Sequence, residues 1–102
     1  MSATDTIFAL SSGAPPAAIA IIRISGPAAF DVVRGLAGRT PAPRRASVAM
    51  LQAPESGEIL DQALLLLFPG PDSATGEDLA ELHIHGGRAV VRAVEKAISQ
   101  FP

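Results

Sequence analysis

The segment Leu79–His85 constrains the fold most, because its apolar and polar side chains alternate with a period near two residues. Successive side chains of a β-strand point to opposite faces of a sheet, so the alternation predicts a strand. Its apolar face consists of Ala80, Leu82 and Ile84, and its other face of Leu79, Glu81, His83 and His85. One face therefore belongs to a core, while the other collects a carboxylate and two imidazoles, which an ordinary strand does not carry.

The residues on either side of this strand predict a turn and a helix. Thr75–Asp78 has the composition of a turn with capping side chains. Gly86 and Gly87 permit a tight bend and the close approach of a ligand or another backbone. A helix is expected from Arg88 to about Gln100, so its free backbone N–H groups would lie beside the polar side chains of the strand.

The rest of the chain predicts an α+β fold with one mixed β-sheet and helices packed on it. Further strands are expected at Thr6–Leu10, Ala18–Ser25, Ser47–Ala53 and Ile59–Phe68, and a helix from Gly26-Pro27 to Gly38. The nearly continuous apolar character of Ala18–Ser25 indicates a strand covered on both faces, and Leu64–Phe68 is typical of a central strand. Because the chain ends just after a helix, we expect a further strand beyond Pro102 and regard residues 1–102 as part of a longer protein.

Composition narrows the class of protein. The chain has 102 residues, of which 48% are hydrophobic, and this favours one small globular domain. A net charge of −2 argues against a strong nucleic-acid clamp, and the absence of cysteine excludes disulfides and thiolate chemistry. No apolar run is long enough to span a membrane, and the polar N-terminus does not have the pattern of a signal peptide, so we expect a cytoplasmic protein. The four phenylalanines are expected in the core.

Two charged residues on predicted strands are the best candidates for a site. Arg23 interrupts an apolar strand and Glu81 lies on the polar face of another, and each needs a partner there. One interpretation is a structural ion pair between the two. The alternative is ligand binding, in which the carboxylate of Glu81 accepts two parallel N–H bonds from a 2-amino-4-oxopyrimidine edge, as in pterins, and Arg23 binds a carboxylate or carbonyl.

Other chemistry is less well supported. His83, His85 and Glu81 could hold a metal ion, but ring nitrogens that are simply hydrogen-bonded are the preferred interpretation, and no metal is predicted. The chain has no P-loop and no serine or cysteine nucleophile motif, so no catalytic residue is expected. The basic loop Arg39–Arg45 is interpreted as a solvated connection or, alternatively, as a minor contact with RNA or a partner protein.

Three groups of motifs, in this order and spacing, resemble the N-terminal domain of the MnmE (TrmE) tRNA-modification GTPase family. They are Asp5-Thr6-Ile7, the segment Ile21–Pro27 (I-I-R-I-S-G-P), and Phe68–Pro71 (F-P-G-P) followed by Thr75–Gly87 (T-G-E-D-L-A-E-L-H-I-H-G-G). Together they extend over almost the whole chain.

The resemblance implies a fold like the folate-binding domain of glycine-cleavage aminomethyltransferases. It also implies a homodimer that binds a 5-formyl-tetrahydrofolate-type donor, with Arg23 and Glu81 as the folate-contacting residues. Separately from the resemblance, we expect His83, His85 and Gly86-Gly87 to shape the pocket floor. In the family, an MnmG-type FAD-dependent partner protein cooperates to add an aminomethyl-type group at C5 of the wobble uridine of certain tRNAs. The helical domain and the GTPase domain, with its GTP, Mg and K, would lie beyond Pro102, so this chain is not expected to hydrolyse GTP.

The sequence departs from the family pattern at two places. Ser12–Ala17 replaces the Gly-Arg-Gly that many relatives carry after the first strand, and Ala74 stands where an aromatic residue usually precedes T-G-E-D. Besides the folate-binding and dimerisation domain, two readings stay open. One is a structural dimerisation module with a vestigial folate site, and the other is a stand-alone folate-dependent methyl-transfer enzyme.

Overall fold

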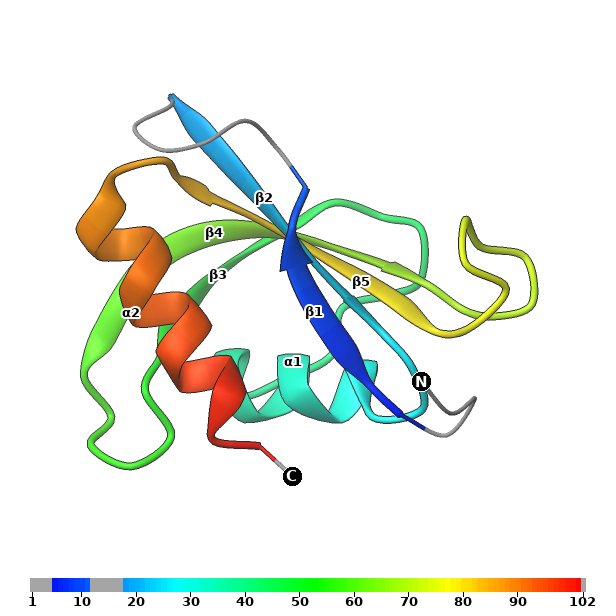
Figure 1. The fold of residues 1–102 in the computed structure, drawn as a ribbon, viewed down its shortest axis with the longest axis horizontal. Helices are drawn as coiled ribbons and strands as arrows, with labels where there is room; N and C mark the ends of the chain where they lie inside the picture. The colour runs from blue at the N-terminus through cyan, green and yellow to red at the C-terminus, as the bar shows by residue number, and fades with distance from the viewer. Residues whose placement is uncertain (1–4, 12–17, 102) are drawn as a thin grey trace.

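The structure, a computed structural model, describes residues 5–11 and 18–101 and has an α+β architecture (Figure 1). Its elements are β1 (Ile7–Leu10), β2 (Ile19–Ser25), α1 (Ala29–Ala37), β3 (Ser47–Gln52), β4 (Ile59–Phe68), β5 (Leu79–His85) and α2 (Arg88–Ser99). The strands form one sheet in the order β1-β2-β5-β4-β3, so β5 occupies its centre. Within the described residues, neither helix is long and apolar enough to cross a membrane.

Every neighbouring pair of strands in this sheet is antiparallel, so the prediction of a mixed sheet is wrong. Alternation along a strand determines which side chains share a face, but it carries no information on the direction of the neighbour. The pairing of β2 with β5 extends over the full length of both strands and sets Arg23 directly opposite Glu81.

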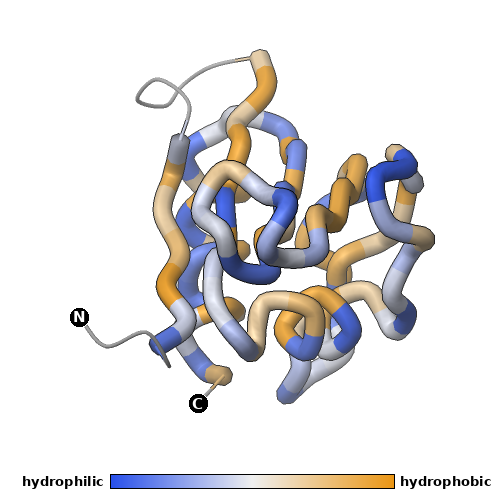
Figure 2. Tube along the Cα trace, turned by 90° about the vertical axis from the view of Figure 1, so that its right-hand side faces the viewer, coloured by the Kyte–Doolittle hydropathy of each residue, from blue (hydrophilic) through white to orange (hydrophobic). Residues whose placement is uncertain are grey.

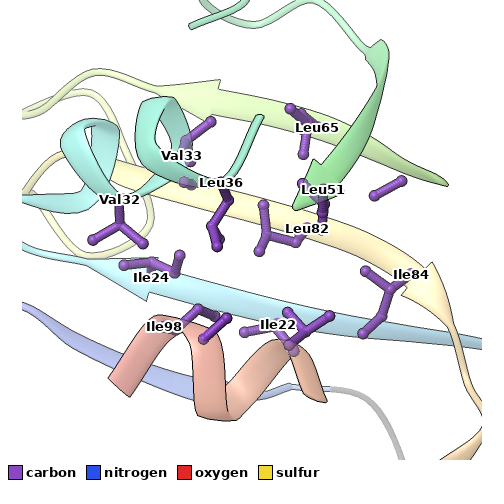
Figure 3. Close-up of a cluster of buried hydrophobic side chains, with 14 of the residues drawn as sticks. Ile22, Ile24, Val32, Val33, Leu36, Leu51, Leu65, Leu82, Ile84 and Ile98 are labelled. Carbon is purple, nitrogen blue, oxygen red and sulfur yellow. The ribbon is translucent and has the colours of Figure 1, made fainter. Parts of the chain in front are cut away.

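Both helices cover the same face of the sheet and form one core with it (Figures 1 and 3). Ile22 and Ile24 of β2 and Leu82 and Ile84 of β5 face the helices and are almost completely buried. Figure 3 shows the side chains of the helices closing over them. Hydrophobic and hydrophilic residues follow one another at short intervals along the trace (Figure 2), as expected for elements with one buried face.

Among the residues that the structure describes, no helix lies over the opposite face of the sheet. The prediction that Ala18–Ser25 is covered on both faces is therefore wrong, since Ile19 is 58% exposed and Arg23 also lies open. A strand with apolar residues on an uncovered face has the same sequence pattern as a fully buried strand. The open face carries the charged side chains of Arg23 and Glu81.

The start of α1 also differs from the prediction. Gly26-Pro27 forms a turn and the helix begins at Ala29, while Gly38 ends it in the left-handed conformation as expected. The side chain of Thr6 supplies the missing cap, because its Oγ1 accepts the N–H of Ala28 at 2.8 Å. Gly26 is required at this crossing, since a Cβ there would lie 2.5 Å from the carbonyl oxygen of Asp5.

Leu82→Ala tests the core at its centre. The side chain is fully buried, so removing three carbon atoms is expected to lower the free energy of unfolding by about 2–5 kcal/mol. Ile59→Ala is the matched control, since it removes the same number of carbons from a side chain that is 57% exposed, and a change within about 0.5 kcal/mol is expected. Urea unfolding measures both values, and equal losses would contradict this description of the core.

Candidate functional site

The antiparallel register of β2 and β5 brings the two predicted site residues together on the open face. Arg23 Nε donates to Glu81 Oε2 at 3.0 Å, so the structure shows the direct ion pair that was the alternative to ligand binding. The two side chains differ in exposure, at 49% for Arg23 and 12% for Glu81. The carboxylate is therefore held in place, whereas the guanidinium keeps other N–H donors toward solvent.

Glu81 is also bound from its own strand. His83 Nε2 lies 3.0 Å from Glu81 Oε1, and because an ionised carboxylate only accepts, the ring nitrogen donates. Burial raises the pKa of Glu81, but the hydrogen bonds from His83 and Arg23 and the charges of these groups outweigh it, so the pKa lies below its ordinary value of 4.5. Glu81 is therefore an ionised acceptor near neutral pH.

The second histidine belongs to a different pair. His85 Nδ1 lies 2.8 Å from Asp61 Oδ1, and the backbone N–H of His85 donates to Asp61 Oδ2 at the same distance. The two imidazoles thus contact separate carboxylates, as the hydrogen-bonded interpretation predicts. In the described part of the chain, no group of three or more His, Cys, Asp or Glu side chains is arranged to hold a metal ion.

A cavity of about 660 Å³ opens next to the ion pair. Its wall combines charged side chains with an aromatic ring and loop residues: Arg23, Arg44, Phe68, Pro71, Asp72, Ser73, Ala74, Leu79 and Glu81. This volume lies within the range of small-molecule sites, roughly 300–1,000 Å³. The direct contact between the two charges therefore coexists with space for a ligand beside them.

The T-G-E-D motif (Thr75–Asp78) does not line this cavity but anchors the loop whose residues Pro71, Asp72, Ser73 and Ala74 form part of its wall. The hydroxyl of Ser25, which is buried at the end of β2, donates to Thr75 Oγ1 at 2.8 Å or to Glu77 Oε2 at 3.0 Å. Asp78 Oδ1 accepts the N–H of Gly70 at 3.0 Å. A Cβ at Gly70 would lie 2.7 Å from the carbonyl carbon of Glu77, so the two halves of the loop pack backbone to backbone.

Two residues of the cavity wall were not predicted as site residues. Phe68 was expected in the core, but it is only half-buried and its ring faces the guanidinium of Arg44, 5.8 Å from the ring centroid. Arg44 was assigned only to the basic loop. Burial alternates along β4 and places Phe68 on the open face, but the unbroken apolar run Leu64–Phe68 gives no sequence signal of this, and nothing in the local sequence connects Phe68 with Arg44.

Other residues predicted at the pocket lie elsewhere. His83 and His85 line a second cavity of about 390 Å³ on the same face, and Gly86-Gly87 lines neither cavity, so their role at a pocket floor stays a prediction. Neither glycine has a positive φ. Ala74, the second departure from the family pattern, does lie in the cavity wall. The departure at Ser12–Ala17 lies outside the described residues.

The pKa of Glu81 predicts a pH-dependent stability. The pKa is lower in the folded state than in the unfolded state, so its contribution is present above about pH 4.5 and disappears as the pH falls through the folded value. The free energy of unfolding of wild type minus that of Glu81→Gln should therefore shrink on acidification below about pH 4.5. Urea unfolding at stepped pH measures this difference, and Asp31→Asn controls for the loss of an exposed carboxylate. A difference that grows on acidification would contradict the assignment.

Comparisons with known proteins agree with the motifs. Residues 6–101 match the family model described as "GTP-binding protein TrmE N-terminus". The relative from Novosphingobium aromaticivorans named tRNA modification GTPase MnmE is 62% identical over 99 residues, which cover 97% of this chain and 23% of the relative. A protein of the same name from Rhizorhabdus wittichii is 59% identical over 103 residues, covering 99% of this chain and 23% of the relative.

The chain thus spans about 23% of the length of these relatives. The family match, in contrast, includes nearly every described residue and both strands that carry the candidate site. The chain belongs to the TrmE family and corresponds to the N-terminal domain of the tRNA modification GTPase MnmE.

Proposed function

We propose that this chain is a folate-binding and dimerisation domain that holds a 5-formyl-tetrahydrofolate-type ligand between Glu81 and Arg23. The observation that carries the proposal is that both side chains line one cavity of about 660 Å³ on the uncovered face of the sheet. A largely buried carboxylate beside a half-exposed guanidinium in a concave, partly apolar site is a common arrangement for binding a polar heterocycle.

The chemistry of Glu81 fits the amino-pyrimidine edge of a pterin. Its carboxylate is held ionised, and a carboxylate with two oxygens can accept two parallel N–H bonds from such an edge. The neighbouring side chains Leu79 and Phe68 offer apolar surface to the flat ring. No other carboxylate of the cavity wall is held in the same way, since Asp72 is exposed.

Binding in this manner requires an exchange of partners. In the structure Glu81 Oε2 accepts from Arg23 and Oε1 lies beside His83. Arg23 is half-exposed, so its guanidinium can turn toward a carbonyl or carboxylate of the ligand at little cost in burial. An approaching pterin would replace the Arg23 hydrogen bond with its own N–H donors, and the ion pair would position the carboxylate until then.

Membership of the family supports a proposal for the role of the whole protein. We infer a homodimeric, cytoplasmic tRNA modification GTPase that acts with an MnmG-type FAD-dependent partner on C5 of the wobble uridine, while GTP, Mg and K bind to a separate GTPase domain. The uncovered sheet face supports a dimerisation role, because Ile19, Val48 and Met50 are exposed on it. In this scheme the present domain orients the one-carbon donor, and the folate supplies the one-carbon chemistry.

A structural dimerisation module with a vestigial site is the second candidate. The 3.0 Å contact between Arg23 and Glu81 favours it, because the two charges already neutralise one another in the structure and need no ligand as a partner. If this candidate is correct, substituting either Arg23 or Glu81 would lower the free energy of unfolding, and no variant would bind the folate.

Calorimetry with 5-formyl-tetrahydrofolate on the complete protein separates the two candidates. We expect wild type to bind and Glu81→Gln to bind at least tenfold more weakly. The glutamine amide has no charge and presents an N–H group where the carboxylate accepted one, and the loss of such a charge-assisted hydrogen bond costs about 1.5–3 kcal/mol of binding free energy. Asp31→Asn, on an exposed ion pair of α1, is the matched control and should leave the affinity unchanged.

Thermal unfolding of the same variants completes the test. The folate-binding proposal expects affinity to fall much more than stability in Glu81→Gln. An absence of heat with wild type, or an unchanged affinity in Glu81→Gln, would reject the site and leave the structural module.

A further inference from the structure

We propose that Arg44 forms a carboxylate subsite in the same cavity and binds the anionic tail of the ligand whose pterin end is held at Glu81. This inference rests on the proposed folate function and adds a residue and a ligand group to it. Arg44 lies in the loop between α1 and β3, far from the two strands in sequence, yet it contributes to the wall of the same cavity.

The backbone at Arg44 is held in a conformation that an arginine rarely adopts. Its φ is +61°, and no other non-glycine residue in the described ranges has a positive φ. This conformation costs free energy for a residue with a Cβ, so the surrounding structure must impose it. The backbone N–H of Arg44 donates to the carbonyl oxygen of Leu67 at 2.8 Å, which fixes the loop against the end of β4.

The guanidinium is fixed from two further directions. It lies over the ring of Phe68, 5.8 Å from the centroid, and Nη2 donates to the backbone carbonyl of Asp72 in the opposite loop. Both contacts orient the planar group while leaving further N–H donors unused. The result is an arginine whose side chain is prearranged for a partner at the cavity.

The charge of Arg44 has no carboxylate partner among the described residues. No Asp or Glu oxygen lies within ion-pair distance of it, whereas Arg23 is paired with Glu81 and Arg34 with Asp31. The other charged groups of the cavity wall are Arg23, Glu81 and Asp72, and the last contacts Arg44 only through its backbone oxygen. An exposed, oriented guanidinium of this kind matches the fork geometry of a carboxylate.

The division of the cavity follows from these charges. Glu81 repels a carboxylate and accepts N–H groups, so it suits the amino-pyrimidine end of a folate. Arg44 offers only donors, so it suits the opposite end, where the glutamate tail carries two carboxylates. Phe68 lies under Arg44 and gives apolar surface to the part of the ligand that joins the two ends.

Arg44→Asn is the variant of choice, because asparagine tolerates a positive φ and removes the cation. Arg44→Gly, which takes this backbone conformation freely, is the second variant and guards against a folding defect of the first. Arg45→Asn is the matched control, since it removes a cation from the next position of the loop, which does not line the cavity.

The test uses calorimetry on the complete protein with two probes, 5-formyl-tetrahydrofolate and its dimethyl ester, in which both tail carboxylates are neutral. Wild type should bind the diacid more tightly than the ester. Arg44→Asn and Arg44→Gly should lower the affinity for the diacid at least tenfold and change the affinity for the ester less than twofold. Arg45→Asn should change neither affinity.

The outcomes separate the two proposals. If wild type binds the diacid but the Arg44 variants lose no affinity, or lose the same affinity for the diacid and the ester, the carboxylate subsite is rejected and the folate site at Glu81 stands. If wild type binds neither probe, the folate function itself is rejected, and the subsite with it.

Discussion

The pairing register of β2 with β5 is the constraint on which the candidate site depends. An antiparallel ladder brings directly opposite side chains to the same face, and this register makes Arg23 and Glu81 opposite each other. A shift of one residue would send one charge into the core beneath the helices. The buried residues Ile22 and Leu82, which are opposite one another in the same ladder, make that shift costly, so core packing positions the ion pair.

The open face of the sheet becomes a cavity only because loops are anchored beside it. Ser25 fastens the loop before β5 to the end of β2, and Arg44 links that loop to the segment before β3. The T-G-E-D residues thus have a structural part in the site, while the strand residues supply its chemistry. Rigid strands that present charged groups and loops that enclose them are a common division of labour in binding domains.

Much of this arrangement was predictable from local pattern. The bounds of β4 (Ile59–Phe68) and β5 (Leu79–His85) agree with the predicted strands, and the α+β class is confirmed. Strand direction was not predictable, because alternation fixes faces and not neighbours. The position of Arg44 in the cavity wall could not be predicted from the sequence either, because its contacts with Phe68 and Asp72 join segments that come together only on folding. Whether the Arg23–Glu81 pair opens for a ligand cannot be predicted from residue types, because both outcomes use the same side chains.

The opening of that ion pair is the central claim, and the Arg23 Nε–H resonance of ¹⁵N-labelled complete protein reports on it directly. Without ligand, this N–H is hydrogen-bonded to Glu81 at 3.0 Å between nitrogen and oxygen. We predict that the resonance shifts on saturation with 5-formyl-tetrahydrofolate, because the pterin takes over the carboxylate and Arg23 turns to a new acceptor. A ligand that binds while the Arg23 resonance stays in place would contradict the account.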